Sequence, residues 1–396
     1  MKMMRRRFIP VGHGAFYCES FFGGEINVVY DCGSMEPKKV EIKEIVEKIF
    51  EKNEKIDALF ISHFDRDHIN GIPYLLKHCN VKNIFFPILT PSCKEVMRIY
   101  FNIMYKSKKI EDDEYQFLDS FINNPIEVIS SINSEKNIRT NVYFISAYID
   151  GEDNQYEYSD NIIVSGENIW KYITKQDNEY LWKYIPYNIP NKEVENKIRE
   201  EIEKVFGKDI TLQGIVEKLK KGETDINVIK KLYKVLEGKT NINSMVLFSG
   251  TDNYNVYSEI RYPRHRCCFR NCNCLCRIPA GFLYTGDYDA KNEDNWEYLF
   301  LAYITYWEYI GGIQLPHHGS NYNYNTQLTD DKISNSISGA YTVLNNMRYA
   351  IASVKEDDSS HPGQIALKDL IMKNKDIFII TEKEDSEVVF EVYHTE

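Results

Sequence analysis

The 396-residue sequence contains no run of eighteen apolar residues, so no membrane-spanning helix is expected. The chain begins with basic residues, but no apolar segment of useful length follows them, and a secretory signal is not expected. Nine cysteines are an odd number for a disulfide framework, which favours a reducing cytoplasm. The net charge of −11 argues against a general polyanion-binding surface, although bound divalent cations would reverse the charge of a local pocket.

Motifs for other enzyme mechanisms are also missing. No Ser-His-Asp, Walker or dinucleotide-binding pattern is present, and the short Gly12-His13-Gly14 segment precedes no helix. We interpret His13 either as a pocket-edge residue or as an ordinary core or surface histidine. With 43% hydrophobic residues the chain can bury one large core, or one core plus a sub-domain. The alternation of predicted strands and helices indicates a layered α/β fold.

The most informative stretch is residues 61–71, Ile-Ser-His-Phe-Asp-Arg-Asp-His-Ile-Asn-Gly. A buried strand is predicted just before it and a short helix over residues 69–78. Four side chains that can bind metal therefore lie at a strand-to-helix turn: His63, Asp65, Asp67 and His68. His63 and Asp65 point to the same side of an extended backbone, whereas the other two can reach a neighbouring position. The pattern suits two adjacent metal ions, and the alternative is a solvated loop with two surface histidines.

This run resembles the metal-binding signature of the metallo-β-lactamase fold. It is most similar to the variant with Asp at position 65, as in the soluble nuclease domain of bacterial competence (DNA-uptake) proteins. The resemblance covers roughly residues 8–90 and 238–370 and implies an α/β protein of the αβ/βα four-layer sandwich type. It also implies that Asp31 supports the metal loop from behind by accepting hydrogen bonds.

The resemblance extends to two later segments. In Thr-Gly-Asp, Asp287 would bridge both metals, and in His-His-Gly-Ser, His317 would bind the second metal while His318 lies near substrate or leaving group. His361 would close the pocket and touch a phosphate or donate a proton, and the alternative is the start of a helix. The implied metal ligands are thus His63, Asp65, Asp67, His68, Asp287 and His317, and the implied catalytic residues are Asp67, His318 and His361.

One departure from the family concerns the first metal position. Many members place a third metal-binding histidine near residue 243, and none is visible in this sequence. Asn243 or Ser244 would orient a water molecule or a substrate oxygen there instead.

We predict three parts of the chain: residues 1–90 and 239–396 form the two halves of one domain, and residues 91–238 are a large, partly helical insertion. The insertion is expected to shape substrate access or to contact a protein partner. A cysteine-rich loop at 261–277 is a candidate for a separate structural zinc, a redox-sensitive loop or a hairpin tip. Its arginines also make it a candidate for nucleic-acid contact. The possible zinc ligands are His265, Cys267, Cys268, Cys272, Cys274 and Cys276.

Two divalent ions, zinc or manganese, would activate water for hydrolysis. Asp65 adds an oxygen ligand to the site, which favours Mn²⁺ over Zn²⁺. Because the resemblance is to nuclease domains, the sequence favours phosphodiester hydrolysis of a nucleic acid or nucleotide. Two alternatives stay open: hydrolysis of a small molecule such as a cyclic nucleotide or a lactone, and a non-catalytic metal-binding scaffold.

Overall fold

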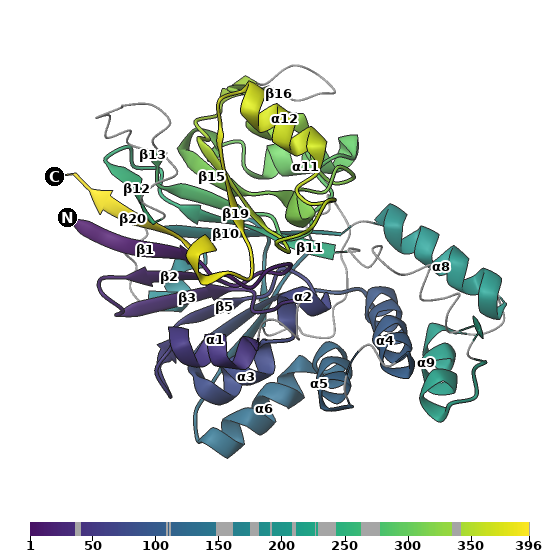
Figure 1. Cartoon of the computed structure of the whole chain (residues 1–396). Coiled ribbons are helices and arrows are strands. Elements are labelled where there is room, and N and C mark those ends of the chain that lie inside the picture. Colours follow the sequence, from purple (N-terminus) through teal and green to yellow (C-terminus); the bar gives the residue numbers. More distant parts are fainter. Residues whose placement is uncertain are drawn as a thin grey trace.

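A computed structural model describes residues 1–35, 41–107, 110, 112–147, 161–174, 182–190, 192–207, 211–225, 227–228, 243–262, 278–334 and 342–395. Two large sheets lie face to face, with helices on both outer sides (Figure 1). Among the described helices, none is long and apolar enough to cross a membrane.

The first sheet mixes antiparallel and parallel strands. Its order is β13 (Ile278–Pro279), β12 (Val256–Tyr262), β20 (Val388–His394), β1 (Lys2–Phe8), β2 (Tyr17–Phe21), β3 (Ile26–Tyr30), β5 (Ala58–Phe60), β7 (Asn83–Pro87), β8 (Asn141–Ile145) and β9 (Ile162–Ile163). From β13 to β3 neighbouring strands are antiparallel, whereas β3, β5, β7, β8 and β9 run parallel. The chain ends meet at β1 and β20, which pair side by side.

The second sheet is smaller. Its order is β10 (Lys183–Pro190), β11 (Asn243–Gly250), β14 (Gly281–Tyr284), β15 (Ile310–Gln314), β18 (Tyr349–Ser353) and β19 (Asp376–Ile380). The last four strands are parallel to one another. Two short ladders complete the strands, β4 (Lys55–Ile56) with β6 (Asn80–Val81), and β16 (Lys332–Ser334) with β17 (Thr342–Leu344).

Helices cover the outer faces of both sheets. The helices near the first sheet are α1 (Ile42–Ile49), α2 (Arg66–Ile69), α3 (Ile72–His78), α4 (Pro91–Lys106), α5 (Asp112–Asn123), α6 (Pro125–Lys136), α8 (Lys192–Phe206) and α9 (Leu212–Lys221). The short α7 (Trp170–Thr174) contributes Trp170 and Ile173 to the core between the sheets. The second sheet is covered by α11 (Glu293–Ala302) and α12 (Gln364–Met372).

Side-chain alternation along the strands separates three cores. On β3, Val28 and Tyr30 face the second sheet while Val29 faces the helices. On β5, Phe60 faces the second sheet and Leu59 the helices. This period of two is what a strand buried on both faces requires. The resulting helix, sheet, sheet, helix order confirms the predicted four-layer sandwich.

The described strands of residues 91–238 join the two sheets of the sandwich. Strands β8 and β9 extend the first sheet, and β10 pairs antiparallel with β11 in the second. The helices α4 and α5 also share the outer core of the first sheet. The predicted division at residues 90 and 238 stays a prediction, but the strands between them belong to the sandwich.

A buried polar network joins the two sheets. Arg6 and Glu19 face each other on β1 and β2, are 0% and 3% exposed, and form an ion pair with Nε to Oε1 at 2.6 Å. The Glu19 carboxylate also accepts hydrogen bonds from Tyr284 Oη at 2.8 Å and Ser249 Oγ at 2.7 Å. Because every charge has a partner, the network can be buried without leaving an isolated ion.

Candidate metal centre

The parallel strands of both sheets end at one edge, and the predicted metal-binding side chains follow those ends. The metal loop, residues 61–68, follows β5, while Asp287 follows β14 and the histidine pair follows β15. Backbone contacts fix the loop tightly: Ala15 N donates to Asp67 O at 3.2 Å and Cys32 N to His68 O at 2.9 Å. At Gly33 a Cβ atom would lie only 2.4 Å from Asp67 O. Only glycine therefore fits beneath the metal loop.

The metal loop also contacts the segment 91–238. Arg66 forms a two-pronged ion pair with Glu114 of α5, with Nε to Oε1 at 2.5 Å and Nη2 to Oε2 at 3.0 Å. Both side chains are mostly buried, so α5 helps to hold the start of α2.

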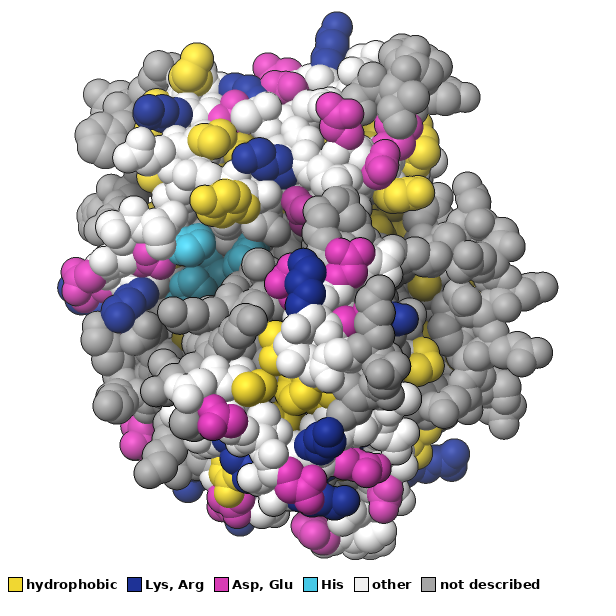
Figure 2. All heavy atoms as spheres, turned by 90° about the vertical axis from the view of Figure 1, so that its right-hand side faces the viewer, with side chains coloured by type: hydrophobic (Ala, Val, Ile, Leu, Met, Phe, Trp, Pro, Cys, Tyr) yellow, Lys and Arg dark blue, Asp and Glu magenta, His cyan; other side chains and the backbone are white. Residues whose placement is uncertain are grey.

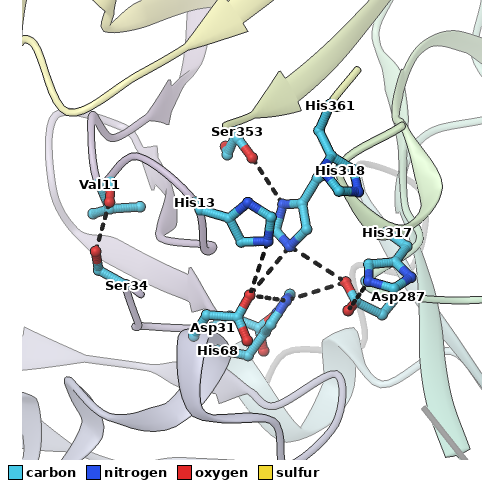
Figure 3. A network of polar contacts seen from close by, with 12 residues as sticks. Val11, His13, Asp31, Ser34, His68, Asp287, His317, His318, Ser353 and His361 are labelled. Atoms are coloured by element: carbon cyan, nitrogen blue, oxygen red, sulfur yellow. Dashed lines mark hydrogen bonds and ion pairs between the residues drawn. The ribbon is translucent and has the colours of Figure 1, made fainter. Parts of the chain in front are cut away.

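Asp31 lies behind the metal loop, fully buried. It accepts hydrogen bonds from Ser62 N at 2.8 Å, Ser62 Oγ at 2.6 Å and His68 Nδ1 at 2.7 Å. Asp31 adopts a left-handed backbone conformation (φ +55°), which a non-glycine residue adopts rarely and at an energetic cost. The carboxylate bonds Nδ1 of His68, whose Nε2 faces Asp287 (Figure 3).

Four histidines share one arrangement, with Nδ1 bonded outward and Nε2 facing a carboxylate. The outward partners are Ser62 Oγ for His63 (2.8 Å), Asp31 Oδ2 for His68 (2.7 Å), Asn323 Oδ1 for His317 (3.0 Å) and the Ser353 carbonyl oxygen for His318 (2.8 Å). Carboxylate, amide and carbonyl oxygens can only accept a hydrogen bond, so the Nδ1 atoms that face them must donate. Ser62 Oγ donates its own proton to Asp31 and must therefore accept from His63 Nδ1. Each of the four Nδ1 atoms thus carries the proton. In the neutral imidazole the Nε2 lone pair is then directed inward, as metal-binding histidines require.

The inward nitrogens surround Asp287 and Asp67. Asp287 Oδ2 lies 3.6 Å from Nε2 of both His63 and His317, and Asp287 Oδ1 lies 3.2 Å from His68 Nε2 and 3.7 Å from His318 Nε2. Asp67 Oδ2 lies 3.1 Å from His318 Nε2 and 3.7 Å from His68 Nε2. The two oxygens of Asp287 therefore face two different pairs of histidines.

These spacings fit a metal better than direct ion pairs. Charge-assisted hydrogen bonds between nitrogen and carboxylate are about 2.7–2.9 Å long. Two ligands of a tetrahedral ion with bonds of about 2.1 Å stand about 3.4 Å apart. The observed separations of 3.1–3.7 Å lie around that value. Nε2 of His63 and of His68 is also buried without a hydrogen-bond partner. The residues present therefore fit divalent cations.

The geometry favours a different assignment of His317 and His318 from the one the sequence suggested. His318, predicted near the leaving group, is 1% exposed and contacts Asp67, the residue expected at the second metal. His317, predicted at the second metal, instead faces the Asp287 oxygen that also faces His63. It therefore lies on the side where the sequence lacks a third histidine. Both histidines have left-handed backbones, with φ +47° and +56°, in the turn that follows β15.

Other predicted residues are placed less closely. Asp65 directly precedes α2, and it belongs to none of the three His/Asp groups among the described residues whose ligand atoms all lie within 4.8 Å of one another. Asn243 begins β11, but its side chain lies outside what the structure describes; the neighbouring Ser244 Oγ accepts a hydrogen bond from Asp287 N at 3.2 Å. Residues 263–277 of the cysteine-rich loop, with His265 and all five of its cysteines, also lie outside the described residues.

A second set of polar side chains lies at the rim. His361, predicted to close the pocket, contacts Asp358, with Nδ1 to Oδ2 at 3.1 Å. Asp358 Oδ2 also lies 3.7 Å from His13 Nδ1, and the His13 ring packs 4.0 Å from the His318 ring. Sequence reasoning left His13 ambiguous and did not single out Asp358. Figure 2 shows histidine side chains gathered in a hollow of the surface.

The charges of the cluster compensate one another. Burial alone raises the pKa of the Asp287 carboxyl, but His317, His68 and His63 hold that pKa well below its usual range. Burial likewise lowers the pKa of His68, but Asp287, Asp67 and Asp31 raise it well above its ordinary value. Asp287 therefore stays ionised and attracts positive charge. Because cations compete with protons for such ligands, metal binding would release protons.

Sequence comparisons agree with this geometry. A model of the metallo-β-lactamase superfamily matches residues 15–118, a range that contains the metal loop but not Asp287 or the histidine pair. The chain thus contains a metallo-β-lactamase superfamily domain. This superfamily is typically hydrolytic and generally binds divalent metals.

Two ribonucleases give short matches. Ribonuclease J of Mycoplasma genitalium is 44% identical over 46 residues, which are 12% of this chain and 8% of that protein. Ribonuclease J of Mycoplasma pneumoniae is 46% identical over 46 residues, with the same coverage. The chain therefore aligns with less than a tenth of the length of either ribonuclease.

Proposed function

We propose that the protein is a metal-dependent phosphodiester hydrolase that acts as a nuclease, with two divalent cations, zinc or manganese, in the cleft. One observation carries the proposal: the two oxygens of Asp287 face two separate pairs of inward-pointing imidazoles. A carboxylate in this position suits the bridge between the two ions of a dinuclear centre.

The first ion would be held by His63, His317 and Asp287 Oδ2, with Asp65 as a further predicted ligand. The second ion would be held by Asp67, His68, His318 and Asp287 Oδ1. When bound, such a pair of cations supplies Lewis acidity and lowers the pKa of a water molecule toward neutrality. Asp67, which the sequence placed among both the metal ligands and the catalytic residues, is assigned here to the metal ligands. His318, which the sequence placed in catalysis alone, is assigned to them as well.

The protein's own groups prepare the ligands. Asp31, Ser353 and Asn323 keep the proton on Nδ1 of three of the histidines, so that Nε2 stays directed into the cleft. His361 is partly exposed at the rim, where it can touch a phosphate oxygen of the substrate. Deep burial of His63, His68 and Asp287 keeps bulk water from competing for these ligands.

The short likeness to ribonuclease J and the resemblance to competence nuclease domains support a nucleic-acid substrate. The chain's net charge of −11 does not by itself attract a polyanion, so cations in the cleft would supply the local positive charge. We expect the protein to leave DNA and RNA intact after chelation.

The test compares metal-stripped and Mn²⁺- or Zn²⁺-loaded protein on DNA, RNA and a chromogenic bis-aryl phosphodiester. Asp67→Ala and Asp287→Asn are expected to abolish cleavage, while Asp331→Asn, whose side chain is 84% exposed and paired with Lys375, should retain it. Cleavage of the chromogen alone would favour a small-molecule substrate. Metal loading without turnover of any of the three would favour a binding scaffold.

A further inference from the structure

The rim cluster of His13, Asp358 and His361 adjoins the inward-facing histidines, because His13 Nε2 lies 4.0 Å from Asp67 Oδ2. His13 lies in the loop between β1 and β2, and the other two lie in the loop between β18 and α12. One ligand atom from each residue lies within 4.8 Å of the other two. The cluster thus joins segments from opposite ends of the chain over the mouth of the cleft.

Asp358 is held in a fixed orientation. Its Oδ1 accepts hydrogen bonds from Ser360 N at 2.7 Å, Ser360 Oγ at 2.6 Å and His361 N at 3.1 Å. These bonds leave Oδ2 as the oxygen that faces both imidazoles, 3.1 Å from His361 Nδ1 and 3.7 Å from His13 Nδ1.

The spacing is that of ligands around a cation. The contact with His13, at 3.7 Å, is too long for a hydrogen bond. The contact with His361, at 3.1 Å, also fits a hydrogen bond, and Ser360 Oγ lies 2.9 Å from the same nitrogen, so a cation here would replace the proton on His361 Nδ1. A carboxylate and two imidazoles are also a donor set suited to zinc or manganese.

We infer that His13, Asp358 and His361 form a third divalent-cation site at the rim of the cleft. The inference extends the proposed nuclease function, since a cation here would face the same substrate. The side chains of the three ligands are 23%, 15% and 22% exposed, whereas those of His63, His68 and Asp287 are 3%, 0% and 4% exposed. The rim site therefore keeps coordination positions open to water or to a phosphate oxygen.

The rival interpretation is a hydrogen-bonded relay of Asp358 between two imidazoles, which binds no metal. The two differ in metal stoichiometry. We would strip the full-length protein with a chelator, titrate it with Mn²⁺, and count bound ions from the free Mn²⁺ signal in electron paramagnetic resonance. Manganese is the appropriate probe because cysteine thiolates, such as those of residues 267–276, select softer metals.

Wild-type protein should bind about three equivalents, and Asp358→Asn and His361→Gln about two, since each variant removes one ligand of the rim site. Asp357→Asn removes a neighbouring exposed carboxylate as a matched control and should still bind about three. Two equivalents in the wild type would overturn the rim site and leave the dinuclear centre intact. No binding would overturn both. A third equivalent that persists in Asp358→Asn and His361→Gln would place the ion elsewhere and refute the inference.

Discussion

Asp31→Asn tests whether the metal loop is held in a binding-competent state from behind. The carboxylate accepts on both oxygens, from the Ser62 amide at 2.8 Å and from His68 Nδ1 at 2.7 Å. An asparagine can accept on only one side. If its oxygen keeps the Ser62 amide, its NH₂ group faces the Nδ1 proton of His68, and two donors meet.

His68 can relieve this conflict only by moving its proton to Nε2, the atom that faces Asp287 and Asp67. Loss of such a supporting contact typically weakens metal affinity about 10- to 100-fold, or about 1.4–2.7 kcal/mol. Loss of one hydrogen bond to a buried charged group also destabilises the metal-free protein by about 1.5–3 kcal/mol. Both effects should therefore appear together.

Affinity is measured by competition with a chromogenic chelator, and stability by urea unfolding of the stripped protein. Asp57→Asn is the matched control, because Asp57 is 2% exposed and paired with Lys55 at 3.1 Å but lies at the opposite end of β5. It should lose stability and keep its metal affinity. Unchanged metal affinity in Asp31→Asn would show that the Nδ1 proton of His68 does not control the site.

Two further predictions concern stability. Glu19→Ala leaves the buried Arg6 without its partner and should lower the free energy of unfolding by about 3–5 kcal/mol in urea titrations, whereas the exposed Glu25→Ala should not. Burial raises the pKa of Glu391, but hydrogen bonds from Lys2, Tyr393, Arg261 and Arg5 lower that pKa overall. The ionised Glu391 therefore stabilises the folded protein above the unfolded-state pKa of about 4.3, and this stabilisation is lost as pH falls. The stability difference between wild type and Glu391→Gln should therefore shrink from pH 7 toward pH 3, and a difference independent of pH would contradict this assignment.

The local sequence pattern was sufficient to predict those features whose residues are contiguous in the chain. The metal loop sits at a strand-to-helix turn between β5 and α2, as predicted. The helices α4, α5 and α6 were not predicted. Their sequences are polar overall, and the faces that they bury are set by contact with the first sheet rather than by a strong pattern of their own.

The roles of individual side chains could not be predicted where they depend on backbone conformation or on tertiary contacts, because neither leaves a local signal in the sequence. His317 and His318 are adjacent, and their left-handed backbones decide which of them faces His63 and which faces Asp67. No residue type in that turn announces this conformation. Asp358 comes close to His13 only because its loop folds over a segment near the N-terminus. Such proximity is a property of the tertiary structure.

The candidate centre depends on both halves of the sandwich. The superfamily match ends at residue 118 and so includes only two of the four inward-facing histidines. Strand β11 joins the halves: Met245 N donates to Ser62 O at 2.7 Å, and Ser244 Oγ accepts from Asp287 N at 3.2 Å. One strand thus fixes the metal loop of the first half against the Asp287 turn of the second. A dinuclear site is therefore a property of the assembled sandwich, because a fragment ending near residue 118 would lack the carboxylate that faces both pairs of histidines.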